Sequence, residues 1–211
     1  MPTRTIKFLT AGGPATSFCW LLLLIFCQCQ SPQIHQRPNI IIINVDDMGW
    51  RDVSFMGSHF YETPNLDSLA SMGMVFNNGY ASAANCAPSR ACLMTGLWTP
   101  RHGVYTVGSS ERGKSAHRRL VPIKNTATLT DSVATLPEIL KANGYSTCHA
   151  GKWHLSDDPT ERGFDQNIGG AHNGHPQSYY YPYGNVNLES AEGDHLTDQI
   201  MNRVVDFVVS V

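Results

Sequence analysis

The chain has 211 residues, of which 42% are hydrophobic and 15% are charged. That composition can bury a sizeable core and allows no more than one or two globular domains. Fifteen Lys and Arg residues against seventeen Asp and Glu residues give a formal charge of −2. Because the chain lacks the overall basic field that draws proteins to nucleic acid, we expect no nucleic-acid partner.

The N-terminal 30 residues have the pattern of a secretory signal peptide. Two cations precede an apolar run over residues 18–27. This run is short for a membrane span and has the length of a signal-peptide core. We therefore predict a signal peptide over residues 1–30, cleavage within residues 27–36, and an exported protein in the periplasm, outside the cell or in the secretory-pathway lumen. A lipid anchor on Cys27 or Cys29 is the alternative to simple cleavage.

Strand signals follow the leader. Residues 39–45 form a near-continuous apolar and β-branched run, which is typical of a central strand buried on both faces. Residues 74–80 and 145–149 favour two further strands.

Helix signals lie between and after these strands. Pro64 is expected to start a helix that stops near Gly73, and Thr135 and Glu138 have capping-box spacing. Residues 197–211 place apolar side chains at helical spacing. Helices between strands predict an α/β fold with a parallel sheet, in which ligands collect beyond the carboxyl ends of the strands.

A lone thiol before a helix is the most informative motif. Cys86 and Pro88 are expected to open this helix, Arg90 follows one turn on, and Gly96 can close it. The free N–H groups and the dipole of a first helical turn favour an anion, and the guanidinium group suits a tetrahedral oxyanion. From these residues alone, a buried structural cysteine is an equally good interpretation.

Two further motifs carry charge near predicted strand ends. Asp46 and Asp47 follow the first strand, and a divalent cation such as calcium or magnesium is a natural partner for adjacent carboxylates. Taken alone, an acidic pair more often forms a solvated turn. Lys152 and His154 are two residues apart, which in an extended segment points both side chains to the same side. The alternative is a surface lysine and a histidine packed on Trp153.

Together these motifs resemble the type I sulfatases of the arylsulfatase family. The chain contains Cys-x-Pro-Ser-Arg-x-x-Leu-x-Thr-Gly, the acidic pair upstream of it and Gly-Lys-Trp-His-Leu downstream, in the family's order. The resemblance runs from about Arg37 to the last residue, with Ser156 as a departure where the family commonly has glycine. It implies an alkaline-phosphatase-like α/β fold, with a central and mostly parallel sheet flanked by helices, over residues 37–211 as the N-terminal portion of a catalytic domain.

The resemblance also implies a chemistry, a sulfuric ester hydrolase acting on a sulfated carbohydrate or related sulfate ester. A maturation enzyme would oxidise Cys86 to formylglycine, whose hydrated aldehyde is the nucleophile. Calcium, with magnesium as the alternative, would be held by Asp46, Asp47 and the modified Cys86. The catalytic set would comprise Cys86, Arg90, Lys152 and His154.

Weaker candidates lie elsewhere in the chain. His172 and His175 lie in a glycine-rich stretch where the family often supplies a further sulfate contact. Tyrosines in residues 179–183 favour ordinary packing, with a sugar-binding platform as the alternative. A basic cluster is expected to be a solvated loop, with attraction to an acidic polysaccharide as the alternative. This cluster comprises Lys114, His117, Arg118 and Arg119.

The remaining cysteines and His102 are expected to be structural. Outside the leader and its edge, Cys92 and Cys148 accompany Cys86. Either a bridge between these two or a pair of buried thiols is compatible with export. His102 is expected to order the turn after the Cys86 helix.

The C-terminal end leads us to expect an incomplete enzyme. The last helical pattern has no stop signal, and family members are considerably longer. We expect the 211-residue form to hydrolyse sulfate esters poorly or not at all. Two alternatives remain at this point, a phosphate or phosphonate ester hydrolase of the same superfamily and a catalytically inactive fragment.

Overall fold

The computed structural model describes residues 37–211, and the predicted signal peptide, its cleavage region and the anchor cysteines lie outside them. The chain divides into two units between Val45 and Asp46, and each is considered by itself. In the first unit, the described residues 37–45 have no regular secondary structure. Ile41 and Ile43 are 70% and 71% exposed.

Two of the predicted strands are therefore wrong for this structure. Residues 39–45 and residues 74–80 are both irregular. In the latter segment Met74 and Phe76 are 78% and 76% exposed. A strand needs a neighbour for its N–H and C=O groups, and the strands of the described chain pair only with each other.

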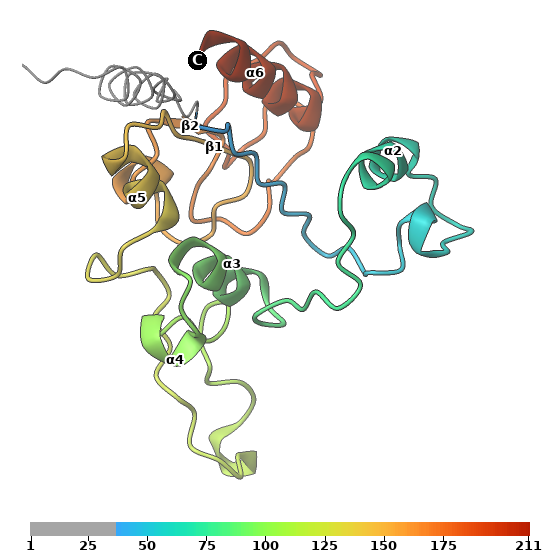
Figure 1. Ribbon diagram of the computed structural model, residues 1–211. Helices are drawn as coiled ribbons and strands as arrows, with labels where there is room; N and C mark the ends of the chain where they lie inside the picture. The colour runs from blue at the N-terminus through green and yellow to red at the C-terminus, as the bar shows by residue number, and fades with distance from the viewer. Residues whose placement is uncertain (1–36) are drawn as a thin grey trace, which may run out of the picture. The chain divides into compact units, whose positions relative to one another are not determined.

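The second unit contains helices and one short parallel sheet, against which α6 and η3 pack (Figure 1). Strand β1 pairs in parallel with β2, and His149 lies opposite Asn167. In chain order the elements are η1 (Ser54–Met56), α2 (Pro64–Met72), α3 (Cys86–Thr95), α4 (Thr99–His102), η2 (Ser115–His117), α5 (Leu136–Ala142), β1 (Cys148–Ala150), η3 (Pro159–Arg162), β2 (Gln166–Ile168) and α6 (Leu196–Ser210).

Local signals placed the helices well. Helix α2 begins at Pro64, as predicted. At the start of α5, the Glu138 N–H donates to Thr135 Oγ1 at 3.4 Å and the Thr135 N–H donates to Glu138 Oε2 at 2.7 Å. The predicted capping box is therefore confirmed.

The first of two cores packs α3 against the segment that follows β1. Ala87 and Ala91 on α3 are buried together with Trp153 and Leu155, and the Leu129 N–H donates to the Leu155 carbonyl at 2.8 Å, which ties in the irregular segment around Leu129. Small alanine side chains let the helix approach closely. This core fixes α3 relative to residues 153–155.

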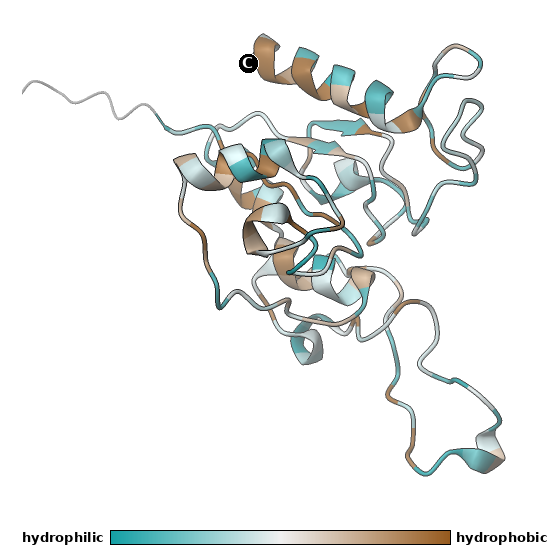
Figure 2. Ribbon diagram, turned by 90° about the vertical axis from the view of Figure 1, so that its right-hand side faces the viewer, coloured by the Kyte–Doolittle hydropathy of each residue, from teal (hydrophilic) through white to brown (hydrophobic). Residues whose placement is uncertain are grey.

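The second core lies where α6 meets the sheet. Ile168, Tyr183, Leu188 and Leu196 are buried there, and Ile200 and Val204 of α6 pack against them. Figure 2 shows apolar residues recurring along α6, as the helical spacing predicted. Among residues 37–211, no helix has both the length and the apolar character that crossing a bilayer requires.

A buried arginine joins α5 to the loop before it. Arg162 is 2% exposed, and its guanidinium donates to the carbonyls of Leu129 at 3.2 Å, Thr130 at 2.9 Å and Val133 at 2.5 Å. Its Nε lies 3.3 Å from the Glu138 carboxylate in an ion pair. Both Nη groups of this side chain therefore hold backbone, while its Nε has the ion pair with Glu138 and no hydrogen bond.

Candidate active site

Helix α3 presents Cys86 at its N-terminal end. Asn85 is the extended N-cap and Cys86 is the first helical residue. The predicted stop at Gly96 is confirmed, since this residue takes a φ of 66° and its N–H bonds to the Cys92 carbonyl at 2.8 Å. Cys86 is a partly buried free thiol at the end of a helix where first-turn N–H groups favour an anion.

The segment after β1 brings His154 to this thiol. Trp153 and Leu155 on either side of it are 1% and 0% exposed in the first core. His154 takes a left-handed φ of 66°, and its N–H donates to the Ala171 carbonyl at 2.9 Å. Its Nδ1 lies 3.4 Å from Cys86 Sγ. The backbone here is not the regular extended segment that the Lys-x-His spacing assumed, yet the side chain still reaches the thiol.

Arg90 lies in the same site with a donor to spare. Its Nη1 donates to the Lys152 carbonyl, and its Nη2 lies 4.0 Å from the Asp46 carboxylate. Its Nε is buried without a hydrogen-bond partner. Burial lowers the pKa of Arg90, and the Asp46 charge opposes this shift. The result is a partly desolvated cation with an unused N–H, which suits an incoming anion.

Lys152 and Asp46 form a close ion pair. The two side chains are 22% and 31% exposed, so water still reaches them. Asp46 therefore faces two cations, Lys152 and Arg90, and partly balances the positive charge of the site.

The electrostatic surroundings keep His154 neutral near pH 7. Burial is the main cause that lowers its pKa, followed by electrostatic interactions with Lys152, His172 and Arg90, while Asp46 raises it. A neutral imidazole has a free lone pair and can accept a proton.

The structure separates the two weaker histidine candidates. The His172 ring lies 6.2 Å from that of His154, and its Nδ1 is buried without a partner. His175 is exposed, and its Nδ1 lies 3.0 Å from the carbonyl of its neighbour Pro176. Only His172 is shown in contact with the group around Cys86.

Sequence reasoning missed Gly174 as a site residue. A Cβ at this position would lie 2.9 Å from Cε1 of His154, so only glycine lets the backbone pass the imidazole ring. The glycine-rich stretch of residues 169–175 was the signal, although spacing alone did not say which glycine mattered.

Two further contacts involve residues close to the site, one at Trp153 beside His154 and one at Cys92 on α3. Ser156, the departure from the family pattern, accepts a hydrogen bond of 2.8 Å from the Trp153 indole. Cys92 Sγ lies 3.3 Å from His102 Nε2, and the Val104 N–H donates to His102 Nδ1 at 3.1 Å. Since Nδ1 accepts, the proton of this neutral ring lies on Nε2 and points at sulfur. Cys92 and Cys148 are both free thiols.

The acidic pair offers part of a cation site. Asp46 and Asp47 provide hard carboxylate oxygens, and calcium takes about six to eight such ligands. Within residues 37–211, no three His, Cys, Asp or Glu side chains converge in a way that could hold a metal ion. The described residues therefore do not by themselves make a calcium site.

Comparison with known proteins decides the family. The model of the family described as Sulfatase matches residues 38–210. The chain belongs to the sulfatase family. Human N-acetylgalactosamine-6-sulfatase is 38% identical over 154 residues, which cover 71% of this chain and 28% of that protein. N-acetylglucosamine-6-O-sulfatase of Bacteroides thetaiotaomicron is 31% identical over 202 residues, covering 93% of this chain and 32% of that protein.

A solved structure gives the same answer for the fold. The crystal structure of Ps i-CgsB is 32% identical to this sulfatase-family chain, with a TM-score of 0.63, over 83% of this chain and 42% of that one. The predicted α/β, alkaline-phosphatase-like fold class is confirmed for the part of the domain that this chain covers. The chain spans about a third of the length of the curated relatives it matches.

Proposed function

We propose that the protein hydrolyses sulfate esters of a carbohydrate, with residue 86 as the source of the nucleophile. One observation carries the proposal: Cys86 Sγ lies 3.4 Å from His154 Nδ1, in a site that also holds the unused donor of Arg90. A nucleophile, a proton acceptor and an anion-binding cation are the three parts that ester hydrolysis by a covalent route requires.

The state of residue 86 is part of the proposal. Cys86 is free, partly exposed and next to a cation, so a maturation enzyme can reach it and a polar product fits the same place. Once formed there, formylglycine would supply a hydrated aldehyde: one hydroxyl would displace the alcohol from the sulfur of the ester, and the other would then release sulfate by re-forming the aldehyde. We propose this modification because the sequence run around Cys86 matches that of the family.

The chain's own residues bind and orient the ester. Arg90 and Lys152 offer N–H groups to the sulfate oxygens, and the N-terminal end of α3 adds its dipole. The neutral imidazole of His154 holds or moves a proton of the residue-86 side chain, at the atom that takes the position of Sγ. His172, 6.2 Å away from His154 between ring centres, extends the donor set toward the substrate.

The names of the relatives support a substrate class. Two of the similar proteins are named for sulfated amino sugars, an N-acetylgalactosamine and an N-acetylglucosamine. We propose a sulfated carbohydrate for the whole protein, without naming the sugar or the sulfated position.

We also propose that Asp46 and Asp47 contribute oxygen ligands to a calcium site in the whole protein. The adjacent carboxylates have the right chemistry, and Asp46 already faces cations in Lys152 and Arg90. Titration calorimetry with calcium chloride on the whole protein should give a binding isotherm that Asp47→Asn weakens. Unchanged binding would exclude Asp47 as a ligand.

Export is proposed for the same protein. The support is the signal-peptide pattern in residues 1–30, which lie outside the described residues.

The test of the proposed function is sulfate release by the whole protein from sulfated N-acetylhexosamines. Cys86→Ala should lower the rate at least about a thousandfold, because it removes the nucleophile. Cys92→Ala is the matched control, since Cys92 is a buried thiol on the same helix that contacts His102 and not His154. The control should keep the rate within severalfold. Full turnover by Cys86→Ala, or a preference for the matching phosphate esters, would contradict the proposal.

A further inference from the structure

A second charged region lies outside the site around Cys86. Residues 109–124, here called the basic arm, hold five of the fifteen Lys and Arg residues and one Glu. Their formal charge is +4, although the whole chain carries −2. The five cations are Arg112, Lys114, Arg118, Arg119 and Lys124. Because these sixteen residues concentrate positive charge, they create a local positive potential that the net charge of the whole chain does not reveal.

Internal hydrogen bonds hold the arm in shape. Arg118 donates from Nε to the Arg112 carbonyl at 3.2 Å and from Nη2 to the Gly113 carbonyl at 3.1 Å. At the base, Asn125 accepts from the Tyr105 N–H at 2.7 Å and donates to the Thr106 carbonyl at 3.0 Å. The side chains of Arg118 and Asn125 therefore stabilise the arm and its base through these hydrogen bonds.

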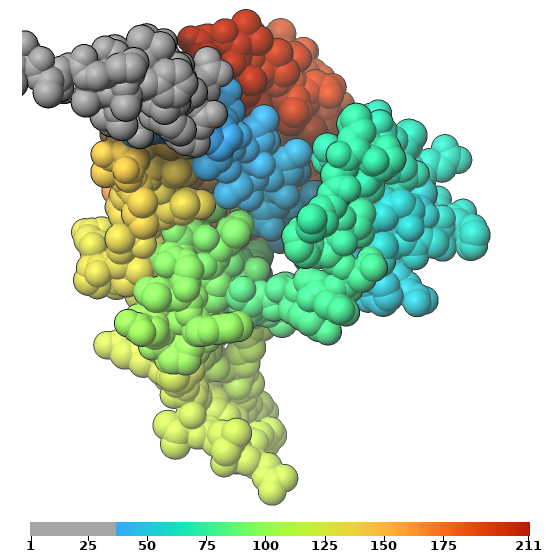
Figure 3. All heavy atoms as spheres, in the orientation of Figure 1, coloured from blue at the N-terminus to red at the C-terminus, as the bar shows by residue number. Residues whose placement is uncertain are grey.

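Three of the other cations of the arm face solvent. Lys114, Arg119 and Lys124 are exposed. Within the described residues none of these three forms an ion pair with a carboxylate, and the single Glu of the arm lies 3.5 Å from Arg118. Figure 3 shows the atoms of this segment, in yellow-green, uncovered on the face it presents.

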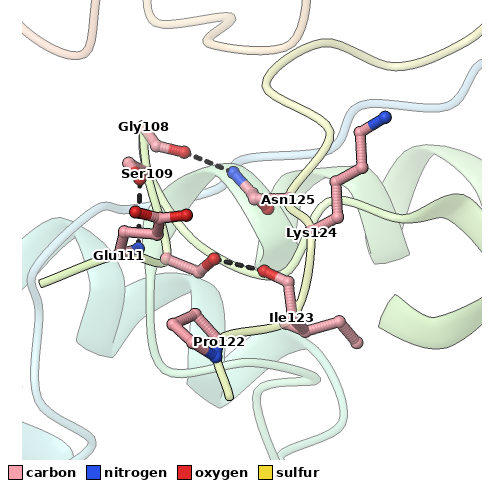
Figure 4. Close-up of a pocket in the computed structure, with 8 residues that line it drawn as sticks. Gly108, Ser109, Glu111, Pro122, Ile123, Lys124 and Asn125 are labelled. Carbon is pink, nitrogen blue, oxygen red and sulfur yellow. Dashed lines mark hydrogen bonds between the residues drawn. The ribbon is translucent and has the colours of Figure 1, made fainter. Parts of the chain in front are cut away.

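Two shallow hollows run along the arm. One, of about 390 Å³, is lined by Glu111, Pro122 and Lys124 among others, and Figure 4 shows the Lys124 side chain leading away from its neighbours. The other, of about 480 Å³, is lined by the guanidinium-bearing Arg112, Arg118 and Arg119. Leu120 and Val121 line it as well and are 85% and 95% exposed.

We propose that the basic arm binds an anionic polysaccharide chain, one that carries sulfate or carboxylate groups along its length. The inference rests on the proposed function, since it extends the same substrate class to a second contact surface. Free ammonium and guanidinium groups pair with the anionic groups, and the exposed apolar side chains cover the flat faces of the sugar rings. The arm thereby raises the affinity for a polymer over that for a single sulfated sugar.

The composition of the arm favours a carbohydrate over nucleic acid. Residues 109–124 contain no Phe, Tyr or Trp. Proteins that bind single-stranded nucleic acid use such side chains as stacking platforms for bases. The arm offers charge and aliphatic surface instead.

The test compares binding of the whole protein to chondroitin sulfate chains in two charge-matched variants. The arm variant carries Lys114→Gln, Arg119→Gln and Lys124→Gln. The control carries Arg51→Gln, Arg101→Gln and Arg203→Gln, which remove three exposed cations elsewhere. We expect the arm variant to bind roughly tenfold to a hundredfold more weakly and the control to bind within about twofold of the wild type. Binding should also weaken as salt is raised.

Several outcomes would overturn the assignment. Equal losses in both variants would make the effect one of net charge alone. Equal affinity for oligodeoxythymidine or for vesicles of anionic phospholipid would exclude a carbohydrate-selective surface.

Turnover of a small aryl sulfate ester separates this inference from the proposed function. The arm variant should keep that rate within about twofold, because the ester is too small to span both surfaces. If the protein hydrolyses the ester but its polymer binding does not depend on the arm, only the proposal that the arm binds polysaccharide is contradicted. Arm-dependent binding with no ester hydrolysis by the wild type would contradict the proposed function and leave the arm supported.

Discussion

Two arginines in the second unit have opposite surroundings. Arg162 is 2% exposed and donates to three backbone carbonyls, with carboxylates of Glu138 and Asp131 at 3.3 Å. Arg90 donates from Nη1 to one carbonyl, and its Nη2 lies 4.0 Å from the Asp46 carboxylate. The Nε of each arginine is buried without a hydrogen bond, but that of Arg162 faces the Glu138 carboxylate at 3.3 Å and that of Arg90 faces none. The first holds loops together, whereas the second has a donor left for a ligand.

The contrast gives a rule for telling structure from function in this fold. A buried cation whose donors are used by backbone stabilises the folded state, because each carbonyl would otherwise lose its partner. A buried cation with unused donors costs stability and is useful only when an anion arrives. Removing each arginine in turn should therefore affect different measurements.

The largest expected effect is on stability, from Arg162→Met. The change leaves the carbonyls of Leu129, Thr130 and Val133 without donors and should lower the free energy of unfolding by about 3–5 kcal/mol. Urea unfolding of the whole protein measures this. A loss under about 1 kcal/mol would remove the distinction between the two arginines.

Arg90→Met should act on catalysis instead. We expect kcat/KM for a sulfate ester to fall roughly 10²- to 10³-fold, because one donor to the sulfate oxygens is lost. The midpoint of urea unfolding should change little. Arg101→Met, which removes an exposed arginine, serves as the control. A large loss of stability with kcat/KM retained would reverse the roles assigned here.

The smallest effect concerns His149, which is buried beside Trp153 and Phe164. Burial, and then the charge of Arg90, lowers the pKa of His149 to about 4. Because the unfolded chain keeps a pKa near 6.5, it binds a proton more readily than the folded one at acidic pH. Stability from this residue is present above pH 6.5 and is lost as the pH falls toward 4, by up to about 3 kcal/mol.

His149→Phe tests that contribution. The ring keeps edge contacts with Trp153 and Phe164 and no longer titrates. Unfolding free energies measured from pH 7 to pH 4 should fall less steeply for the variant than for the wild type. Parallel curves would show that another group controls the acid response.

The sequence predicted what local chemistry decides. Pro64, the Thr135 capping box and the left-handed Gly96 each act within one helical turn, so their signals can be read without the rest of the fold. The strands predicted over residues 39–45 and 74–80 need a neighbouring strand, and no local pattern supplies one.

The candidate site divides in the same way. Its residue types and order along the chain identified Cys86, Arg90, Lys152 and His154. Which of the two histidines in the glycine-rich stretch would reach the site depended on the close approach of Gly174 to the His154 ring and on the packing of His172 against that ring. Such contacts join residues that spacing alone does not pair.

The central claim is that residue 86 carries the nucleophile in a form made from cysteine. Its most direct measurement is the mass of the peptide that contains residue 86, isolated from the exported protein. We predict a mass in which the –CH₂–SH group of Cys86 has become an aldehyde, while Cys92 in the same region stays a thiol. An unmodified thiol at position 86 throughout the exported and active protein would contradict it.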